Sequence, residues 1–290
     1  MNPTSDFTFT DEDRTQRAYD TGADIAKKRM AAEAPLTAEA LAAIEATDML
    51  VVPGCYDHVD RVLAALEVPY QTIESGALGK VRLRPHQLLI VNCPGHLSTA
   101  EIDQVRRFVA SGGALFSTDW ALRHLIEPAF PGFIEFNDQA TGDEVVRIDI
   151  VDSTSPYLQG VLDSDDDPQW WLEGSSYPIR ILDTDSVRVL IRSKELGARY
   201  GNDPVAVVFE FGHGKVFHMI SHYYLQRTEL RNERHQQPAA WYAASKGVSV
   251  SPKFAASAQD LTLGEVEGAT TSARLLANIA AEKKLRAMEK

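Results

Sequence analysis

Short apolar runs alternate with helical periods along the first half of the chain. "DMLVVPG" at 48–54 and "HQLLIVNCPG" at 86–95 are apolar runs closed by Pro-Gly, which is typical of buried parallel strands. Between them, 59–66 carries apolar residues at helical spacing, with Asp57 as a candidate cap. "PYQTIES" follows as a further strand. The pattern therefore predicts two strands with a helix between them, and a third strand beside them.

The same alternation continues to residue 130. Ser98 and Glu101 stand at capping-box spacing before a helix that ends at Gly112-Gly113. "ALFST" is the next buried strand, and "DWALRHLIEPAF" is the next helix. Strands and helices in this order predict an α/β fold with a mostly parallel sheet and helices on both faces, of the flavodoxin-like type.

The second half and both ends have a different pattern. "VVRIDIVD", "PIRILD" and "VRVLIRS" are strand-like, and 204–221 reads as an antiparallel hairpin turning at Gly212-His213-Gly214. Helices are expected within 11–46, with Thr37 as a cap after Pro35, and at 270–288, with a polar excursion over 228–268 between. This suggests a helical extension at 1–47, a main domain at 48–227, and an excursion with a terminal helix at 228–290.

Charge and cysteine content narrow the function classes. The formal net charge is −12, with no basic stripe, which argues against nucleic acid and anionic membranes as partners. The apolar runs are strand-sized, and the start of the chain does not resemble a signal peptide. Two cysteines cannot form a disulfide framework, so we expect reduced thiols and a cytoplasmic location.

Four segments together resemble the class I glutamine amidotransferase-like fold, nearest its trehalose-utilisation (ThuA-like) branch. They are "LLIVNCPGHLS", "VRRFVASGGALFSTDW", "VRIDIVDSTSPYLQGV" and "PVAVVFEFGHGKVFHMISHYY". The resemblance covers about 48 to 225. Active members carry a Gly-x-Cys-x-Gly elbow after the Gly-Gly strand and a later His-x-Glu pair. This chain has Thr118-Asp119-Trp120 at the elbow, with no glycine beside it, and Tyr224 two residues after His222. Glutaminase activity is therefore not expected.

Polar side chains follow the strands of the predicted sheet. In such sheets, ligands bind beyond the carboxyl ends of the strands. That rule gathers a rim of candidate ligand-binding residues and three candidate catalytic residues. The ligand-binding candidates are Cys55, Tyr56, Asn92, His96, Trp120 and Tyr223, and the catalytic candidates are Cys93, His222 and Asp119.

The rim residues admit several interpretations. Cys93 is either a nucleophile activated by His96 or His222, or a half-buried packing residue, and we favour packing. Asp119 is either a general acid or base, or the cap of the helix at Trp120, and we favour the cap. Cys55, Cys93, His96 and His222 are zinc-ligand types but are scattered along the chain, so no metal and no cofactor is expected.

Two further motifs have competing interpretations. "DSDDDPQWW" at 163–171 suits either calcium or, as we favour, a solvated acidic turn. For its adjacent tryptophans, Trp170 and Trp171, the alternatives are that one is an exposed anchor or that both are covered, and we slightly favour the second. "FGHGK" at 211–215 joins two strands and is read as a turn, not a phosphate loop.

Two functions remain. The first is a non-catalytic, ligand-binding or regulatory subunit of this fold, contacting a protein or small molecule through the rim and the Trp170–Trp171 segment, with a homodimer as an option. The second is a hydrolase or carbohydrate-modifying enzyme that uses Cys93, His222 and Asp119, with Asn92 holding an oxyanion. The missing elbow cysteine favours the first.

Overall fold

The α/β class expected from the sequence is confirmed by the computed structural model, which describes residues 11–55, 57–74, 76–249 and 252–289. The main sheet runs in the order β2-β1-β3-β4-β12-β11-β10-β7. Its first five strands are parallel, and the last three pairings are antiparallel. In sheet order the strands are β2 (Gln71–Thr72), β1 (Met49–Val52), β3 (Leu88–Val91), β4 (Ala114–Thr118), β12 (Gly214–Met219), β11 (Pro204–Phe211), β10 (Arg188–Arg192) and β7 (Asp149–Ile150).

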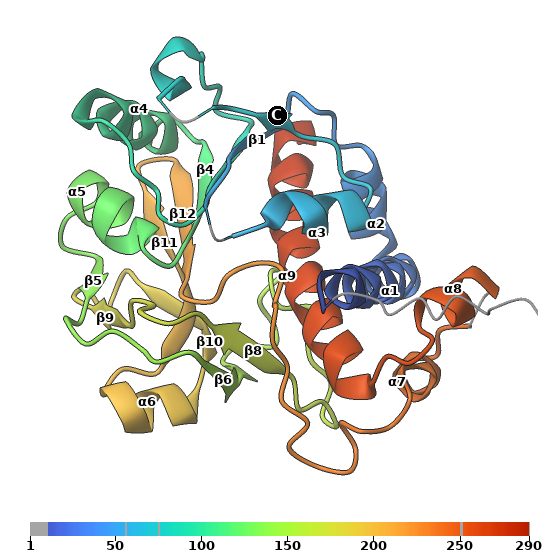
Figure 1. The fold of residues 1–290 in the computed structure, drawn as a ribbon. Coiled ribbons are helices and arrows are strands. Elements are labelled where there is room, and N and C mark those ends of the chain that lie inside the picture. Colours follow the sequence, from blue (N-terminus) through green and yellow to red (C-terminus); the bar gives the residue numbers. More distant parts are fainter. Residues whose placement is uncertain (1–10, 56, 75, 250–251, 290) are drawn as a thin grey trace, which may run out of the picture.

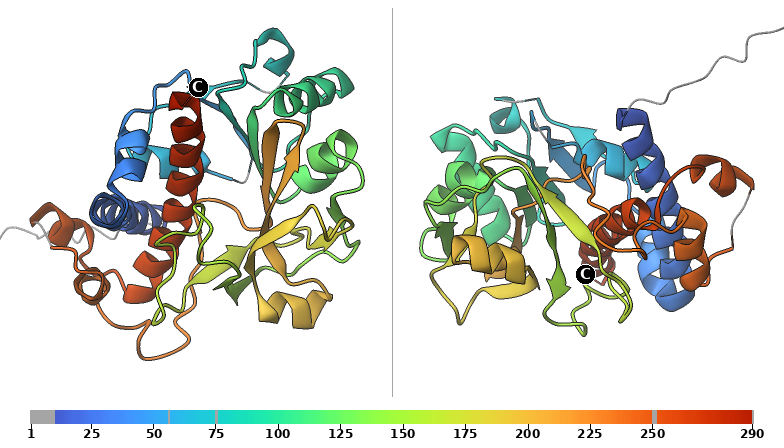
Figure 2. Two further views of the ribbon diagram at one scale, coloured as in Figure 1. Left: turned by 180° about the vertical axis from the view of Figure 1, so that it is seen from behind. Right: turned by 60° about the horizontal axis from the view of Figure 1, so that its bottom comes forward.

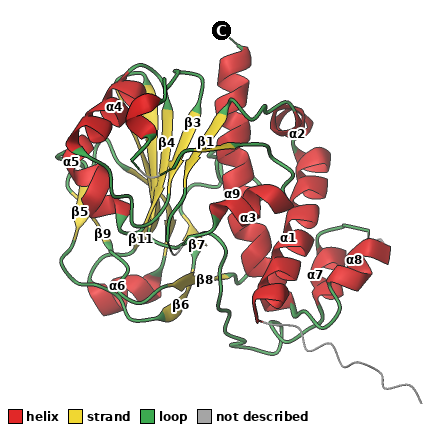
Figure 3. Cartoon of the chain, turned by 45° about the horizontal axis from the view of Figure 1, so that its top comes forward, coloured by secondary structure: helices red, strands yellow, loops and turns green. Residues whose placement is uncertain are grey.

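Helices cover both faces of this sheet (Figures 1 and 3). Along β3, Leu88 and Ile90 pack into one core, while Leu89 and Val91 pack into the other, because successive strand residues face opposite sides. The first core is shared with α1 (Asp11–Glu33), α2 (Pro35–Ala42), α3 (Val59–Ala65) and α9 (Leu263–Met288). The second lies under α4 (Thr99–Ala110), the π-helical turn η2 (Leu122–Ile126) and α5 (Glu127–Ala129).

The strands predicted in the second half are also present. The predicted hairpin is β11 and β12, joined at Gly212 and His213, so "FGHGK" is a turn as expected. Two small antiparallel sheets pair β5 (Ile134–Phe136) with β9 (Ile179–Ile181), and β6 (Glu144–Arg147) with β8 (Gln169–Leu172). The short helices η1 (Leu78–Lys80) and α6 (Lys194–Tyr200) complete the middle of the chain.

The terminal helix is longer and more central than the sequence indicates. The excursion contains α7 (Ala239–Ser245) and α8 (Pro252–Ser257), which lie beside α9 and α1 (Figures 1 and 2). Helix α9 begins at Leu263, where Thr262 and Glu265 form a capping box, and every residue of 263–281 except Glu265 is buried. A helix buried all round has no polar face, so its first turns show no amphipathic period. The prediction of a start at 270 was wrong for this reason.

Of the helix caps predicted at Ser98, Thr37 and Asp57, the structure contains one and lacks two. The capping box of Ser98 and Glu101 is confirmed. Thr37 is not a cap, because α2 begins at Pro35. Asp57 is not a cap either, since α3 begins at Val59 without a side-chain cap. Within the described residues, no helix combines the length and apolar character needed to cross a membrane.

Candidate functional site

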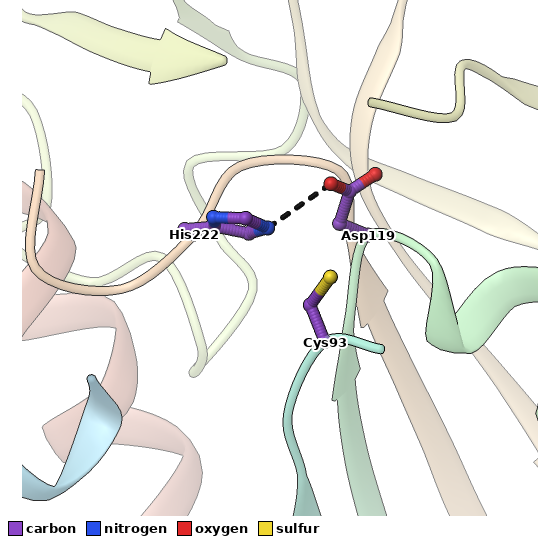
Figure 4. A group of neighbouring side chains, drawn as sticks. All are labelled: Cys93, Asp119 and His222. Carbon is purple, nitrogen blue, oxygen red and sulfur yellow. Dashed lines mark hydrogen bonds and ion pairs between the residues drawn. The ribbon is translucent and has the colours of Figure 1, made fainter. Parts of the chain in front are cut away.

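The three candidate catalytic residues meet at the carboxyl edge of the sheet (Figure 4). Cys93 follows β3, Asp119 follows β4 directly, and His222 lies three residues beyond β12. Nε2 of His222 is 3.0 Å from Oδ2 of Asp119. One ligating atom of each residue lies within 4.8 Å of the other two, and all three residues are buried. The sequence rule that gathers polar residues at strand ends therefore brings these three together.

The backbone at Asp119 makes a sharp turn between β4 and η2. Its φ of 42° lies in the left-handed region, which a non-glycine residue rarely adopts. Its N–H donates to the carbonyl of Met219 at 2.8 Å, which ties the turn to β12, the neighbour of β4 in the sheet. Gly95 makes room for this turn from the neighbouring loop, because a Cβ there would lie 2.6 Å from that of Ala121. The chain thus forms an elbow without glycine beside Asp119, contrary to the sequence expectation.

The carboxylate of Asp119 does not cap the following helix, so that favoured interpretation was wrong. Oδ1 accepts from the backbone N–H of Tyr177 at 2.8 Å. Oδ2 accepts from the hydroxyl of Ser176 at 3.0 Å as well as from His222. The turn points the side chain toward β12 and the loop after β8, away from the amides of η2, whose N-terminus has no side-chain cap.

The loop at 173–177, directly after β8, contacts Asp119 and His222. Besides Ser176 and Tyr177 it supplies Glu173, whose Oε2 lies 3.0 Å from Nδ1 of His222, at ion-pair distance but outside hydrogen-bond alignment. Trp120 closes the same side: its indole N–H donates to the carbonyl of Ser175 at 2.7 Å, and its ring stacks on Tyr177. Trp120 is therefore part of a cover, as a lid or packing residue would be.

Burial and charge set the protonation of this cluster. Burial alone would lower the pKa of His222, but Asp119, Cys93 and Glu173 stabilise its protonated form and raise the pKa well above the ordinary value. Burial raises the pKa of the Cys93 thiol, and the nearby His222 opposes this only in part. Burial also raises the pKa of Asp57 to about 6. Burial raises the pKa of the Asp119 carboxyl too, and its hydrogen bond to His222 opposes this.

Asp57 and Glu173 are two further carboxyl groups near His222, and sequence reasoning missed only Glu173. Oδ1 of Asp57 accepts from the backbone N–H of Tyr223 at 2.9 Å, which holds the chain next to His222. Asp57 follows the first strand, so the strand-end rule places it on the rim in addition to its proposed role as a helix cap, whereas Glu173 was not considered. Glu173 stands two residues after Trp171, so a carboxylate at the end of a buried strand was the available signal.

The other candidate residues are spread between the surface and the core. Cys55 and His96 are exposed, and the ring of His96 lies against that of His124, with centroids 4.0 Å apart and planes tilted by 39°. Tyr56 lies outside the described residues. Asn92 is buried, and its amide nitrogen donates to the carbonyl of Asp57 at 3.3 Å rather than facing an open space.

Tyr223, a candidate ligand-binding residue, is fully buried and packs against Phe116 at 5.4 Å between ring centroids. Of the four zinc-ligand candidates, only Cys93 and His222 belong to the group of ligating atoms found among the described residues. Cys55 and His96 are replaced there by Asp119. The four-ligand zinc set is therefore not gathered.

The tryptophan pair and the acidic stretch serve the core. Trp170 and Trp171 are both buried, and their indole N–H groups donate to Thr271 and Asp143, so the favoured interpretation is confirmed and the exposed anchor is excluded. Lys246 donates to Asp163 at 2.5 Å and to Asp166 at 2.6 Å. The stretch is a turn whose residues 163–165 are exposed, as favoured, but the side chains of Lys246 and Asp166 are only 4% and 1% exposed and form a buried ion pair beneath it.

Comparison with known proteins gives weak structural likenesses only. No protein-family model matches the chain, and no curated protein matches its sequence. A β-galactosidase from Rahnella sp. R3 is similar over 63% of this chain but only 30% of its own, at 14% identity and a TM-score of 0.43. A cytoplasmic protein from Salmonella typhimurium has 12% identity over 60% of this chain and 87% of its own, with a TM-score of 0.43.

A candidate GMP synthase component from Thermoplasma acidophilum is similar at the same level. Its identity is 13%, over 61% of this chain and 83% of its own, with a TM-score of 0.44. The matched part of this chain spans less than a third of the β-galactosidase. Nothing about activity follows from likenesses at this level.

Proposed function

We propose that this chain is a non-catalytic protein that works by binding a ligand or a partner, with the Cys93–Asp119–His222 cluster holding its strand ends together. The observation that carries the proposal is burial: Cys93, Asp119 and His222 are each only 1% exposed to solvent. A nucleophile must reach its substrate as a thiolate. Here the loop at 173–177 covers Asp119, and burial raises the pKa of the Cys93 thiol.

The contact surface of such a protein differs from the one expected from the sequence. Trp170 and Trp171 are excluded from it because they are buried. Exposed Cys55 and His96 remain on the rim. Trp241 on α7 is 62% exposed, and tryptophan is enriched at the centres of protein interfaces. The excursion that carries Trp241 is thus the better candidate for a partner contact.

The proposal is tested by a search for turnover. Purified protein is incubated with activated esters, small amides including glutamine, and aryl and acetylated glycosides. We expect no multiple turnover above the level of the Cys93→Ala variant. Turnover that is lost in Cys93→Ala and kept in the matched Cys55→Ala variant would overturn the proposal, since Cys55 is the exposed cysteine of the pair.

A second candidate is a hydrolase that uses Cys93 as a relocated nucleophile. It is favoured by proximity: the sulfur of Cys93, a ring nitrogen of His222 and a carboxylate oxygen of Asp119 all lie within 4.8 Å of one another. The thiolate would attack a carbonyl carbon, and His222 would move the thiol proton to the leaving group. The raised pKa of His222 opposes this, because an imidazolium cannot accept that proton. One N–H of the Asn92 amide is already bonded to the carbonyl of Asp57, which leaves only the other for an oxyanion.

A further inference from the structure

The cluster at the carboxyl edge of the sheet presents three different ligating atoms to one point. A sulfur, an imidazole nitrogen and a carboxylate oxygen converge from three separate loops, and Figure 4 shows Cys93 beneath the pair of His222 and Asp119. We propose that Cys93, Asp119 and His222 form a binding site for a divalent transition-metal ion of the zinc type. This inference goes beyond the proposed function, because such an ion can be held whether or not a substrate is turned over.

The spacing of the ligating atoms suits a small ion. Nε2 of His222 and Oδ2 of Asp119 are 3.0 Å apart. Two ligands bound at about 2.0 Å to a tetrahedral zinc ion are about 3.3 Å apart, so these two atoms need to move only by tenths of an ångström. The remaining separations are at most 4.8 Å. A sulfur and a nitrogen bound to one tetrahedral zinc ion are about 3.5 Å apart, so binding requires the Cys93 side chain to turn toward the pair.

The mixture of donors selects the class of ion. Thiolate and imidazole suit zinc and its neighbours in the first transition row, whereas magnesium and calcium prefer sets made only of oxygen. Three protein ligands also leave the fourth corner of a tetrahedron for water or a small ligand.

The charges balance when the ion binds. One thiolate and one carboxylate neutralise a divalent cation, and His222 binds through its neutral form. The ion therefore replaces the thiol proton of Cys93 and the Nε2 proton of His222, and both protons leave to solvent. Neither metal nor sulfur changes oxidation state.

The ligands already have the outer partners found around metal sites. A metal-binding histidine usually directs its other ring nitrogen at a carboxylate. Nδ1 of His222 lies 3.0 Å from Oε2 of Glu173. Asp119 is held by Ser176 and by the backbone of Tyr177, neither of which needs to move. Glu173 is in this account a positioning residue that fixes the ring of His222.

Cobalt provides the direct test, because its complexes with thiolate are coloured. The full chain is treated with a chelator, transferred to chelator-free buffer and titrated with Co²⁺ alone. We expect a thiolate-to-cobalt charge-transfer band that saturates at one ion per chain and disappears when Zn²⁺ is added. Cys55→Ser should keep the band, because Cys93 is then the only thiol. Cys93→Ser should lose it.

The variant Glu173→Gln tests whether Glu173 is a metal ligand or a residue that only positions His222. This variant should keep the charge-transfer band but bind Co²⁺ about 10-fold to 100-fold more weakly. The expected pattern supports the site even if Cys93→Ser folds poorly, since Cys55→Ser and Glu173→Gln both retain all three ligands. Absence of a band in the wild type, or its loss in Cys55→Ser, would overturn the proposal. The two proposals can fail independently. Turnover would contradict the non-catalytic function, whether or not an ion binds. Failure to bind Co²⁺ would contradict the metal site, whether or not turnover is found.

Discussion

At the scale of single residues, Asp119 combines an unusual backbone with a buried charge. Its φ of 42° favours glycine, while its carboxylate holds His222, Ser176 and Tyr177. The two effects can be separated by substitution, because Asp119→Ala and Asp119→Gly both remove the carboxylate and differ only in the Cβ.

We predict that Asp119→Gly is more stable than Asp119→Ala by about 1 kcal/mol, the cost of a left-handed backbone for a residue with a Cβ. Both should be less stable than the wild type, because His222 loses a buried partner. The measurement is the free energy of unfolding in urea. Equal stability of the two variants, or a more stable alanine, would show that the turn is not strained.

His218 on β12 gives a prediction about pH. It is fully buried, its Nδ1 pairs with the hydroxyl of Ser117 at 2.9 Å, and its Nε2 has no hydrogen-bond partner among the described residues. Burial lowers its pKa to about 3. Between pH 6.5 and 3 the unfolded chain therefore binds a proton that the folded chain does not, so stability falls as the pH falls, by about 1.4 kcal/mol per pH unit.

The variant His218→Gln should show a smaller loss of unfolding free energy than the wild type between pH 6.5 and 4.5. His213→Gln serves as the matched control, because His213 lies exposed at the turn of the same hairpin. A full wild-type slope in His218→Gln would rule out this role for His218.

At the scale of elements, the acidic stretch before β8 is tied to α7 by Lys246. We predict that Lys246→Met lowers the free energy of unfolding by about 2 to 3 kcal/mol, because Asp166 would be left buried with only the more distant Arg234. The matched control is Lys194→Met. Lys194 is 86% exposed and lies 3.7 Å from Asp149, so its loss should cost less than about 0.5 kcal/mol. Similar losses in both variants would contradict the buried pair.

At the scale of the whole molecule, the sequence predicts the sheet better than what surrounds it. Strands such as β3 and β4 are buried on both faces, so they appear as continuous apolar runs that are easily recognised. The start of α9 is hidden for the opposite reason, because a helix buried on every side has no periodic polar face. Cys93, Asp119 and His222 were placed by the strand-end rule.

The strand-end rule could have offered Glu173 as a candidate, but its place beside His222 depends on the path of the loop after β8. The sign of φ at Asp119 depends in the same way on Gly95, which lies in another loop and makes room for Ala121. Such positions are set by packing between distant segments, and no local pattern in the sequence encodes them.

The central claim is that the thiol of Cys93 is closed off and not activated, and its alkylation rate tests this most directly. The rate is measured against pH on the metal-free Cys55→Ser chain, where Cys93 is the only thiol, with and without His222→Ala. We predict slow alkylation, with an apparent pKa above the value of about 8.5 for free cysteine. Rapid alkylation with an apparent pKa well below that value, lost in His222→Ala, would contradict the claim and indicate a working nucleophile.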